Sequence, residues 1–190
     1  MIILTGFNSF GRYFTNLSSE IVKNIDFRNT RFKVAKYILP VSWKESITTY
    51  KQILSELNSS PKLVLLLGIH TQKKISFEQY AWNFKLGTDI NHKTKFGLIK
   101  LHFLPWIKTT LNLSKIYSNL KDKKKISISY FPGFYLCNYL YFWALCFSRK
   151  QYPVIFIHFP DKGNIDTSIR TLEDILTSIM KVHFNNNLYI

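Results

Sequence analysis

A strand, a tight turn and an apolar helix follow one another in the stretch Ser129-Tyr-Phe-Pro-Gly-Phe-Tyr-Leu-Cys137-Asn-Tyr-Leu-Tyr-Phe-Trp143. The strand precedes it from Ile126, and the Pro132-Gly133 pair is typical of a turn. Cys137 then falls in the first turns of the helix, where unpaired backbone N–H groups and the helix dipole favour a thiolate. Because the thiolate is the nucleophilic form, this placement indicates a catalytic cysteine, and a buried structural cysteine is the alternative.

Short apolar segments alternate with amphipathic ones along the rest of the chain. This alternation predicts an α/β fold, a single domain with a mostly parallel twisted sheet flanked by helices on both faces. The expected strands are Ile2–Thr5, Phe32–Leu39, Leu63–Leu67, Ile75–Trp82, Ile126–Ser129 and Val154–His158. The expected helices are Ser18–Asn24, Ser42–Leu57, Leu113–Leu120, Phe134–Phe147 and Asp166–Val182.

One segment departs from this alternation, at about residues 84–110. It has no clear period and contains Gly87, Gly97 and Pro105. We expect an irregular excursion there, within one domain that covers residues 1–190.

Parallel sheets of this kind bind ligands beyond the carboxyl ends of their strands. The loop after the first strand, Cys137 and His158 should all lie at that edge of the sheet.

The composition of the 190-residue chain fits a folded protein. Hydrophobic residues make up 46% and aromatic residues 16%, which excludes a disordered chain. The net charge of +15 raises the question of nucleic-acid binding. However, most basic residues are dispersed lysines, whereas bidentate phosphate recognition favours arginine. The one dense run, Lys121-Asp-Lys-Lys-Lys125, is best explained as a solvated connection, so the sequence disfavours a nucleic-acid partner.

Cysteine usage and the chain start favour the cytoplasm. Cys137 and Cys146 lie nine residues apart in one predicted helix, about 13 Å along its axis, which is too far for a disulfide. The start at Met1 enters a strand-like run directly, with no cleavable signal. The uncharged run from Ile126 to Ser148 is long enough to span a membrane, but Pro132-Gly133 and Asn138 interrupt it, so we expect no membrane partner.

A cysteine nucleophile needs a base, and the base needs an acid that orients it. His158 ends an apolar strand at the expected cleft and is the best candidate base among the histidines. Glu78 stands among hydrophobic residues, where a carboxylate is costly unless paired, so it is the candidate orienting acid. A core histidine and an edge-strand glutamate remain the structural alternatives. No residue set has metal-ligand spacing and no phosphate loop is present, so we expect no metal and no cofactor.

The chain resembles pyroglutamyl-peptidase I, a family of cytosolic cysteine peptidases that remove N-terminal pyroglutamate. Four blocks carry the resemblance, in the order of the family. They are Thr5-Gly-Phe-Asn-Ser-Phe-Gly11 with Asn16-Leu-Ser18, Leu39-Pro-Val41, Leu67-Gly68 with Ile75-Ser-Phe-Glu78 and Asn83, and Gly133-Phe-Tyr-Leu-Cys137-Asn-Tyr139 with Phe156-Ile-His-Phe-Pro160.

The resemblance implies a catalytic triad of Glu78, Cys137 and His158. Cys137 would attack the carbonyl after pyroglutamate and form a thioester, and His158 would accept and return the proton. The substrate-binding residues would be Phe7, Phe10 and Leu136, with the two phenylalanines enclosing the flat lactam ring. A peptide with an N-terminal pyroglutamate is the implied partner, and a dimer or tetramer is the implied homo-oligomer.

Two departures from the family pattern leave a second function open. The family carries an arginine that helps the oxyanion hole, but the matching stretch here is Gly87-Thr-Asp-Ile-Asn91. Lys85 or backbone N–H groups would have to substitute for it, which predicts a weakened activity. The glycine-rich loop after the third strand is replaced by Ile69-His-Thr-Gln-Lys73. The alternative is therefore a catalytically impaired or repurposed relative that acts as a basic binding or interaction protein.

Overall fold

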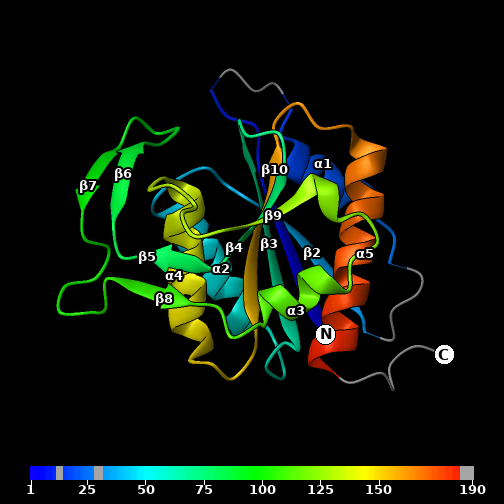
Figure 1. Cartoon of the computed structure of the whole chain (residues 1–190). Helices are drawn as coiled ribbons and strands as arrows, with labels where there is room; N and C mark the ends of the chain where they lie inside the picture. The colour runs from blue at the N-terminus through cyan, green and yellow to red at the C-terminus, as the bar shows by residue number, and fades with distance from the viewer. Residues whose placement is uncertain (12–14, 28–31, 185–190) are drawn as a thin grey trace.

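The computed structural model describes residues 1–11, 15–27 and 32–184, which form an α/β domain around a twisted six-stranded sheet (Figure 1). The strand order across the sheet is β2-β1-β3-β10-β4-β9. The first four of these strands are parallel, β4 runs antiparallel to β10, and β9 runs parallel to β4. The predicted fold class, a mostly parallel sheet with helices on both faces, is confirmed.

The elements follow the predicted order closely. The strands of the main sheet are β1 (Ile2–Phe7), β2 (Val34–Leu39), β3 (Leu63–His70), β4 (Ile75–Glu78), β9 (Ile126–Ser129) and β10 (Val154–Pro160). The helices are α1 (Leu17–Asn24), α2 (Glu45–Ser55), α3 (Leu113–Ser118), α4 (Leu136–Ser148) and α5 (Ile165–His183), with a short 3-10 turn at Lys123–Lys125. Four further strands lie outside the main sheet: β5 (Tyr80–Trp82), β6 (Lys85–Thr88), β7 (Thr94–Gly97) and β8 (Trp106–Lys108).

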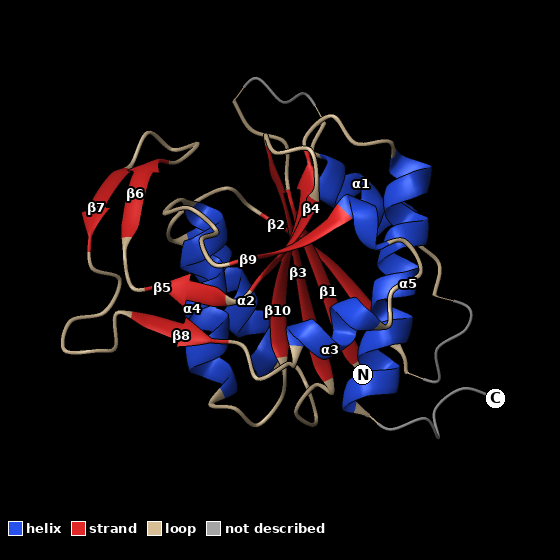
Figure 2. Cartoon of the chain, viewed as in Figure 1, coloured by secondary structure: helices blue, strands red, loops and turns tan. Residues whose placement is uncertain are grey.

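The sheet separates two hydrophobic cores. Helices α1, α3 and α5 cover one face, and α2 and α4 cover the other (Figure 2). The run Leu63–Leu67 is apolar on both faces because its side chains enter the two cores alternately, as expected for a strand inside a parallel sheet. Helix α4 is the most apolar helix and packs on β10, and no helix in the described residues is long and apolar enough to cross a membrane.

The predicted strand Ile75–Trp82 is in fact two strands in two sheets. β4 ends at Glu78, and β5 begins at Tyr80 and pairs with β8 instead of continuing in the main sheet. The backbone N–H and carbonyl of Gln79 bond to Ser129 and Thr109, and these two partners turn the chain away. Hydrophobic periodicity could not reveal this break because strand-like residues resume directly after Gln79, from Tyr80 to Trp82.

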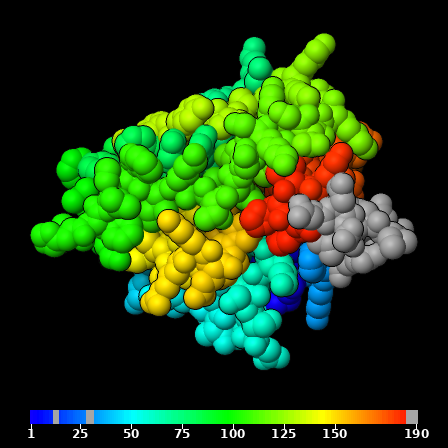
Figure 3. All heavy atoms as spheres, turned by 60° about the horizontal axis from the view of Figure 1, so that its bottom comes forward, coloured from blue at the N-terminus to red at the C-terminus, as the bar shows by residue number. Residues whose placement is uncertain are grey.

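The segment 84–110, expected to be irregular, contains β6, β7 and β8. β6 and β7 form an antiparallel hairpin with partners from Lys85↔Gly97 to Thr88↔Thr94, and β8 pairs with β5. Together these strands form a lobe beside α4, which Figure 3 shows in green along the left of the molecule. The sequence does not predict this hairpin, because its strands are four residues long and mostly exposed and therefore show no alternation of apolar and polar residues.

Two buried polar side chains on α4 hold this lobe and the end of β4 in place. The Asn138 side chain accepts from the Trp82 N–H at 2.7 Å and donates to the carbonyls of Trp82 and Phe84 at 2.8 Å each. The Tyr141 hydroxyl donates to the Glu78 carbonyl at 2.9 Å. These bonds pair backbone groups that the strand break would otherwise leave buried without partners.

We predict that Asn138→Ala destabilises the fold. The change leaves two carbonyls and one N–H of the 82–84 backbone without their partner, which should lower the free energy of unfolding by about 2–3 kcal/mol in urea denaturation. Asn119→Ala is the matched control, because that exposed amide only bonds one carbonyl of its own helix, and it should change stability by less than about 0.5 kcal/mol. Equal stabilities for the two variants would contradict the proposed tether.

Candidate active site

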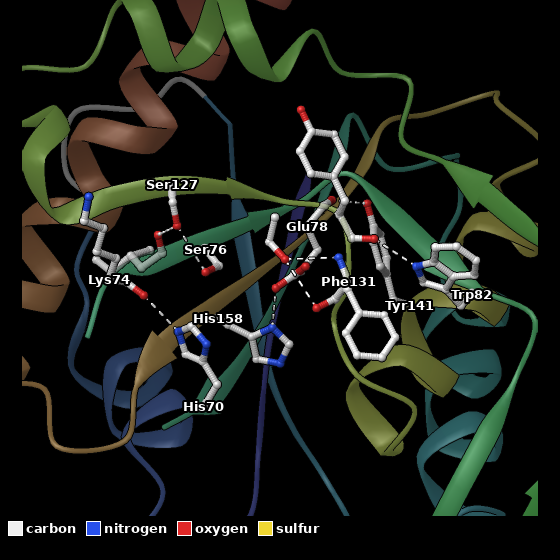
Figure 4. A network of polar contacts seen from close by, with 12 residues as sticks. His70, Lys74, Ser76, Glu78, Trp82, Ser127, Phe131, Tyr141 and His158 are labelled. Atoms are coloured by element: carbon white, nitrogen blue, oxygen red, sulfur yellow. Dashed lines mark hydrogen bonds and ion pairs between the residues drawn. The ribbon is translucent and has the colours of Figure 1, made fainter. Parts of the chain in front are cut away.

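Glu78 and His158 form a buried hydrogen-bonded pair. The Glu78 Oε1 and His158 Nδ1 atoms lie 2.8 Å apart, and the residues are 1% and 4% exposed (Figure 4). They meet because β4 runs antiparallel to β10, with Glu78 opposite Phe156 and Ser76 opposite His158. Since Glu78 is buried, the predicted alternative of a solvent-facing edge-strand glutamate is wrong. Oε2 has no hydrogen-bond partner among the described residues, so the pair with His158 is the main compensation for this buried carboxylate.

Cys137 lies on the same face of the sheet, as the second residue of α4. Gly68 of β3 stands opposite His158 in the register of β3 and β10. A Cβ atom built on Gly68 would lie 3.1 Å from the Cys137 Sγ and 2.8 Å from the Phe156 ring. The missing side chain of Gly68 therefore makes room for the cysteine sulfur beside the histidine strand.

The electrostatic environment holds His158 in its charged form near neutral pH. Burial by itself lowers the pKa of the imidazole, but hydrogen bonding and charge from the Cys137 sulfur and the Glu78 carboxylate raise it to about 9. The sulfur and the imidazole are thus close enough to interact directly. A charged imidazole between a thiol group and a carboxylate can serve as a proton donor to a leaving group.

The first turn of α4 places backbone N–H groups next to Cys137. The N-cap residue Tyr135 makes no capping bond with its side chain, and its hydroxyl instead donates to the Thr88 carbonyl at 2.8 Å. The Tyr135 ring lies against Gly87, where a Cβ would come within 2.6 Å of it. Because the first N–H groups of a helix lack intrahelical partners, this end of α4 can bind an anionic oxygen.

The predicted substrate-binding residues lie near this end of α4 but differ in exposure. Phe7 and Leu136 are buried at 3% and 1% exposure, both in the core between the sheet and α4. Phe10 is half-buried, and its ring centroid lies 6.4 Å from that of Tyr135. Trp43 also contacts Tyr135, with the two ring centroids 5.5 Å apart in an edge-to-face arrangement. An aromatic wall of Phe10, Tyr135 and Trp43 therefore stands beside Cys137.

The segment that replaces the arginine stretch of the family is fixed by a carboxylate. The buried Asp89 side chain accepts hydrogen bonds from the backbone N–H groups of Trp43, Asn91 and Lys93 at 2.9–3.0 Å. Burial alone would raise the pKa of Asp89, but these donors hold it below the usual value. The ammonium of Lys85 donates to the carbonyl of Leu98.

Sequence reasoning missed several residues that build this site. Trp43 and Tyr141 carried no motif signal, because an aromatic residue beside an apolar helix is most simply read as core, and Tyr135 stood in a family block without an assigned role. A cavity of about 950 Å³ lies on the opposite side of the sheet, between α1 and α5, and includes no predicted site residue. In the described ranges, no cluster of His, Cys, Asp or Glu could hold a metal ion.

Comparison with known proteins gives a family assignment. The family model described as pyroglutamyl peptidase matches residues 1–170. The pyrrolidone-carboxylate peptidase of Thermococcus litoralis is 31% identical over 168 residues, covering 84% of this chain and 76% of the relative. The pyrrolidone-carboxylate peptidase of Lactobacillus helveticus is 26% identical over 167 residues, covering 84% of this chain and 82% of the relative.

Solved structures agree with the sequence comparison. The structure of the pyrrolidone carboxyl peptidase from Thermococcus litoralis superposes with a TM-score of 0.85 at 26% identity, covering 100% of this chain and 97% of that one. The structure of the pyrrolidone carboxyl peptidase from Thermus thermophilus shares the fold, with a TM-score of 0.84 at 20% identity over 93% of this chain and 98% of that one. The match over residues 1–170 and the relative at 31% identity lead to one conclusion: the chain belongs to the pyroglutamyl peptidase family.

Proposed function

We propose that the protein is a cysteine exopeptidase that removes pyroglutamate from the N-terminus of peptides. One observation carries the proposal: a buried Glu78–His158 pair at 2.8 Å lies beside a cysteine at the start of a helix. In this proposal Cys137 is the nucleophile, His158 is the acid and base, and Glu78 orients the imidazole. The family assignment supports the peptidase chemistry, and the geometry supports the cysteine as its nucleophile.

The reaction proceeds in two steps. The Cys137 thiolate attacks the carbonyl carbon that follows the lactam ring, and the new C–S bond places a negative charge on the carbonyl oxygen. The C–N bond then breaks as His158 donates its proton to the leaving amine, which yields a thioester. Water attacks this thioester while His158 takes its proton, the C–S bond breaks, and pyroglutamic acid leaves with the thiolate restored. Glu78 stabilises the charged imidazole in both steps.

The oxyanion of the first step is assigned to the N-terminus of α4. Cys137 stands in the first turn of this helix, whose first backbone N–H groups lack intrahelical partners, and the helix dipole adds to their effect. The ammonium of Lys85 is engaged by a carbonyl and does not replace the family arginine. Because one oxyanion donor typically contributes about 2.7–4 kcal/mol, we propose a slower enzyme than relatives that carry the arginine.

The lactam ring is assigned to the aromatic wall beside Cys137. The half-buried Phe10 offers an apolar face to a small neutral ring, and Phe7 and Leu136 back this wall from the adjoining core. The hydrogen bond from the Tyr135 hydroxyl to the Thr88 carbonyl ties the edge of this wall to the backbone of β6. A flat neutral ring fits this lining better than a charged N-terminus would.

A repurposed, non-catalytic relative is the second candidate function. Its support is the net charge of +15 together with the loss of the family arginine at residues 87–91. Such a protein would keep the fold and use its basic surface to bind a partner. The two candidates differ in one respect that can be measured, namely turnover of a pyroglutamyl peptide by the wild-type protein.

Self-association and a cytoplasmic location complete the proposal. The lobe of residues 84–110 exposes large apolar side chains, among them Phe96 at 76% and Leu101 at 71%, which favours burial in a homo-oligomer. Both cysteines, Cys137 and Cys146, are free thiols, as a reducing compartment would keep them.

We predict that the purified protein releases a fluorophore from a pyroglutamyl amide and forms a thioester on Cys137. Cys137→Ala should abolish turnover, because no other group can form the acyl intermediate. Acid quenching followed by peptide mass spectrometry should find the pyroglutamyl adduct on the wild-type peptide that contains Cys137.

Cys146→Ala is the matched control, since this half-buried thiol lies elsewhere on α4 and should leave the rate unchanged. A folded wild-type protein without turnover at high enzyme concentration would reject the peptidase proposal and favour the binding protein.

We predict that Glu78→Gln lowers kcat by at least about 100-fold and shifts the pH profile. The wild-type kcat/KM should fall as pH rises through about 9, because His158 then loses the proton that it donates to the leaving amine. Glu78 is one of the groups that raise this pKa, so its neutral replacement should move the falling limb to lower pH.

Glu20→Gln serves as the control, because Glu20 pairs with Lys23 on the surface of α1 and should change neither kcat nor the profile. An alkaline limb at the same pH in the wild type and in Glu78→Gln would show that Glu78 does not act on the catalytic proton.

A further inference from the structure

A second histidine lies in the site, and the proposed mechanism gives it no role. His70 ends β3, and its ring centroid lies 5.2 Å from that of His158 with 32° between the ring planes. Figure 4 shows the two rings side by side, with Glu78 beyond His158. His70 belongs to the loop sequence that departs from the family pattern, so no motif drew attention to it.

The orientation of His70 is fixed by its neighbours. Its carbonyl accepts from the Asp161 N–H at 2.8 Å, which ties the end of β3 to the turn after β10. Its ring Nε2 lies 2.9 Å from the Lys74 carbonyl, across the loop that follows β3. Because a carbonyl can only accept, Nε2 carries the hydrogen, and Nδ1 of the neutral ring is the unprotonated nitrogen.

The two rings differ in charge near neutral pH. Burial, followed by the charge of His158, lowers the pKa of His70, while the Lys74 carbonyl, Glu78 and Asp161 act in the opposite direction. His158 is charged over the same range, because its own pKa is raised to about 9. A neutral aromatic ring packed against a cation is favourable, whereas two adjacent cations repel.

We propose that His70 is a positioning residue for His158: its neutral ring supports the charged imidazole in the orientation set by Glu78, and its protonation at acidic pH withdraws that support. The charged groups that face it are His158 and Asp161 from β10 and the following turn, and Glu78 from β4. With both rings charged, the proton of His158 passes more readily to the Cys137 thiolate. The resulting thiol is a poorer nucleophile, so the reaction slows. This inference rests on the proposed roles of Cys137 and His158.

Two variants of His70 distinguish the effect of its aromatic ring from the effect of its charge. His70→Phe keeps an aromatic ring that cannot be protonated, and His70→Ala removes the ring. We would measure kcat and KM for a pyroglutamyl amide between pH 5 and pH 9. Over the same range, peptide mass spectrometry would give the rate at which iodoacetamide alkylates Cys137. His183→Phe, an exposed histidine at the end of α5, is the control for loss of an imidazole elsewhere.

At pH 7.5 we expect His70→Phe to keep kcat within about threefold of the wild type, and His70→Ala to lose about fivefold or more in kcat with KM little changed. At pH 5.5, His70→Phe should retain a several-fold larger fraction of its neutral-pH rates than the wild type, in both turnover and alkylation. Identical pH profiles for the wild type and His70→Phe would overturn the inference. Equal losses of kcat in His70→Phe and His70→Ala at every pH would show that His70 has only a structural role, and this result would also overturn the inference.

The alkylation rate keeps this test separate from the proposed function. If the wild type hydrolyses no pyroglutamyl amide but its alkylation profile still differs from that of His70→Phe, the peptidase proposal fails and the role of His70 stands. If turnover is observed and the two alkylation profiles coincide, the peptidase proposal stands and the role of His70 fails.

Discussion

The hydrogen bond between Glu78 and His158 is the interaction on which the site depends. A carboxylate at 1% exposure would be costly to ionise in isolation, and the imidazole 2.8 Å away supplies the compensating charge. The pair exists only because β4 runs against β10 and then stops at Glu78. The reversal of strand direction between β10 and β4 thus creates the acid–base pair, and the strand break after Glu78 lets the chain leave for the lobe beside α4.

Helix α4 connects this pair to the nucleophile. Its first turn carries Cys137. Two other side chains of the same helix bond to the strand backbone, Tyr141 to the carbonyl of Glu78 and Asn138 to Trp82. Gly68 leaves the space into which the sulfur fits, next to the strand of His158. The same helix therefore sets the positions of the nucleophile and of the orienting acid, so the distance between them is a property of the packed core and not of a loop.

The main sheet and its helices could be predicted from the sequence, but the residues that surround the site could not. Leu63–Leu67 is recognisable because a strand buried on both faces is continuously apolar, and Cys137 is recognisable because a turn precedes an apolar helix. The break after Glu78 and the β6–β7 hairpin leave no such signal, since they depend on hydrogen bonds to Ser129, Thr109 and Asn138. The contact between His70 and His158 joins two strands that are far apart in the sequence, so only the register of β3 and β10 reveals it.

Titration of the His158 ring by NMR tests most directly whether the three groups act together. If the Cys137 sulfur and the Glu78 carboxylate both act on the imidazole, the ring signals of the wild-type protein should titrate with a pKa of about 9. Assignment by comparison with a His158→Gln variant identifies the signals. A titration near the ordinary histidine value of about 6.5 would show that neither neighbour stabilises the charged ring, and it would contradict a catalytic triad at this site.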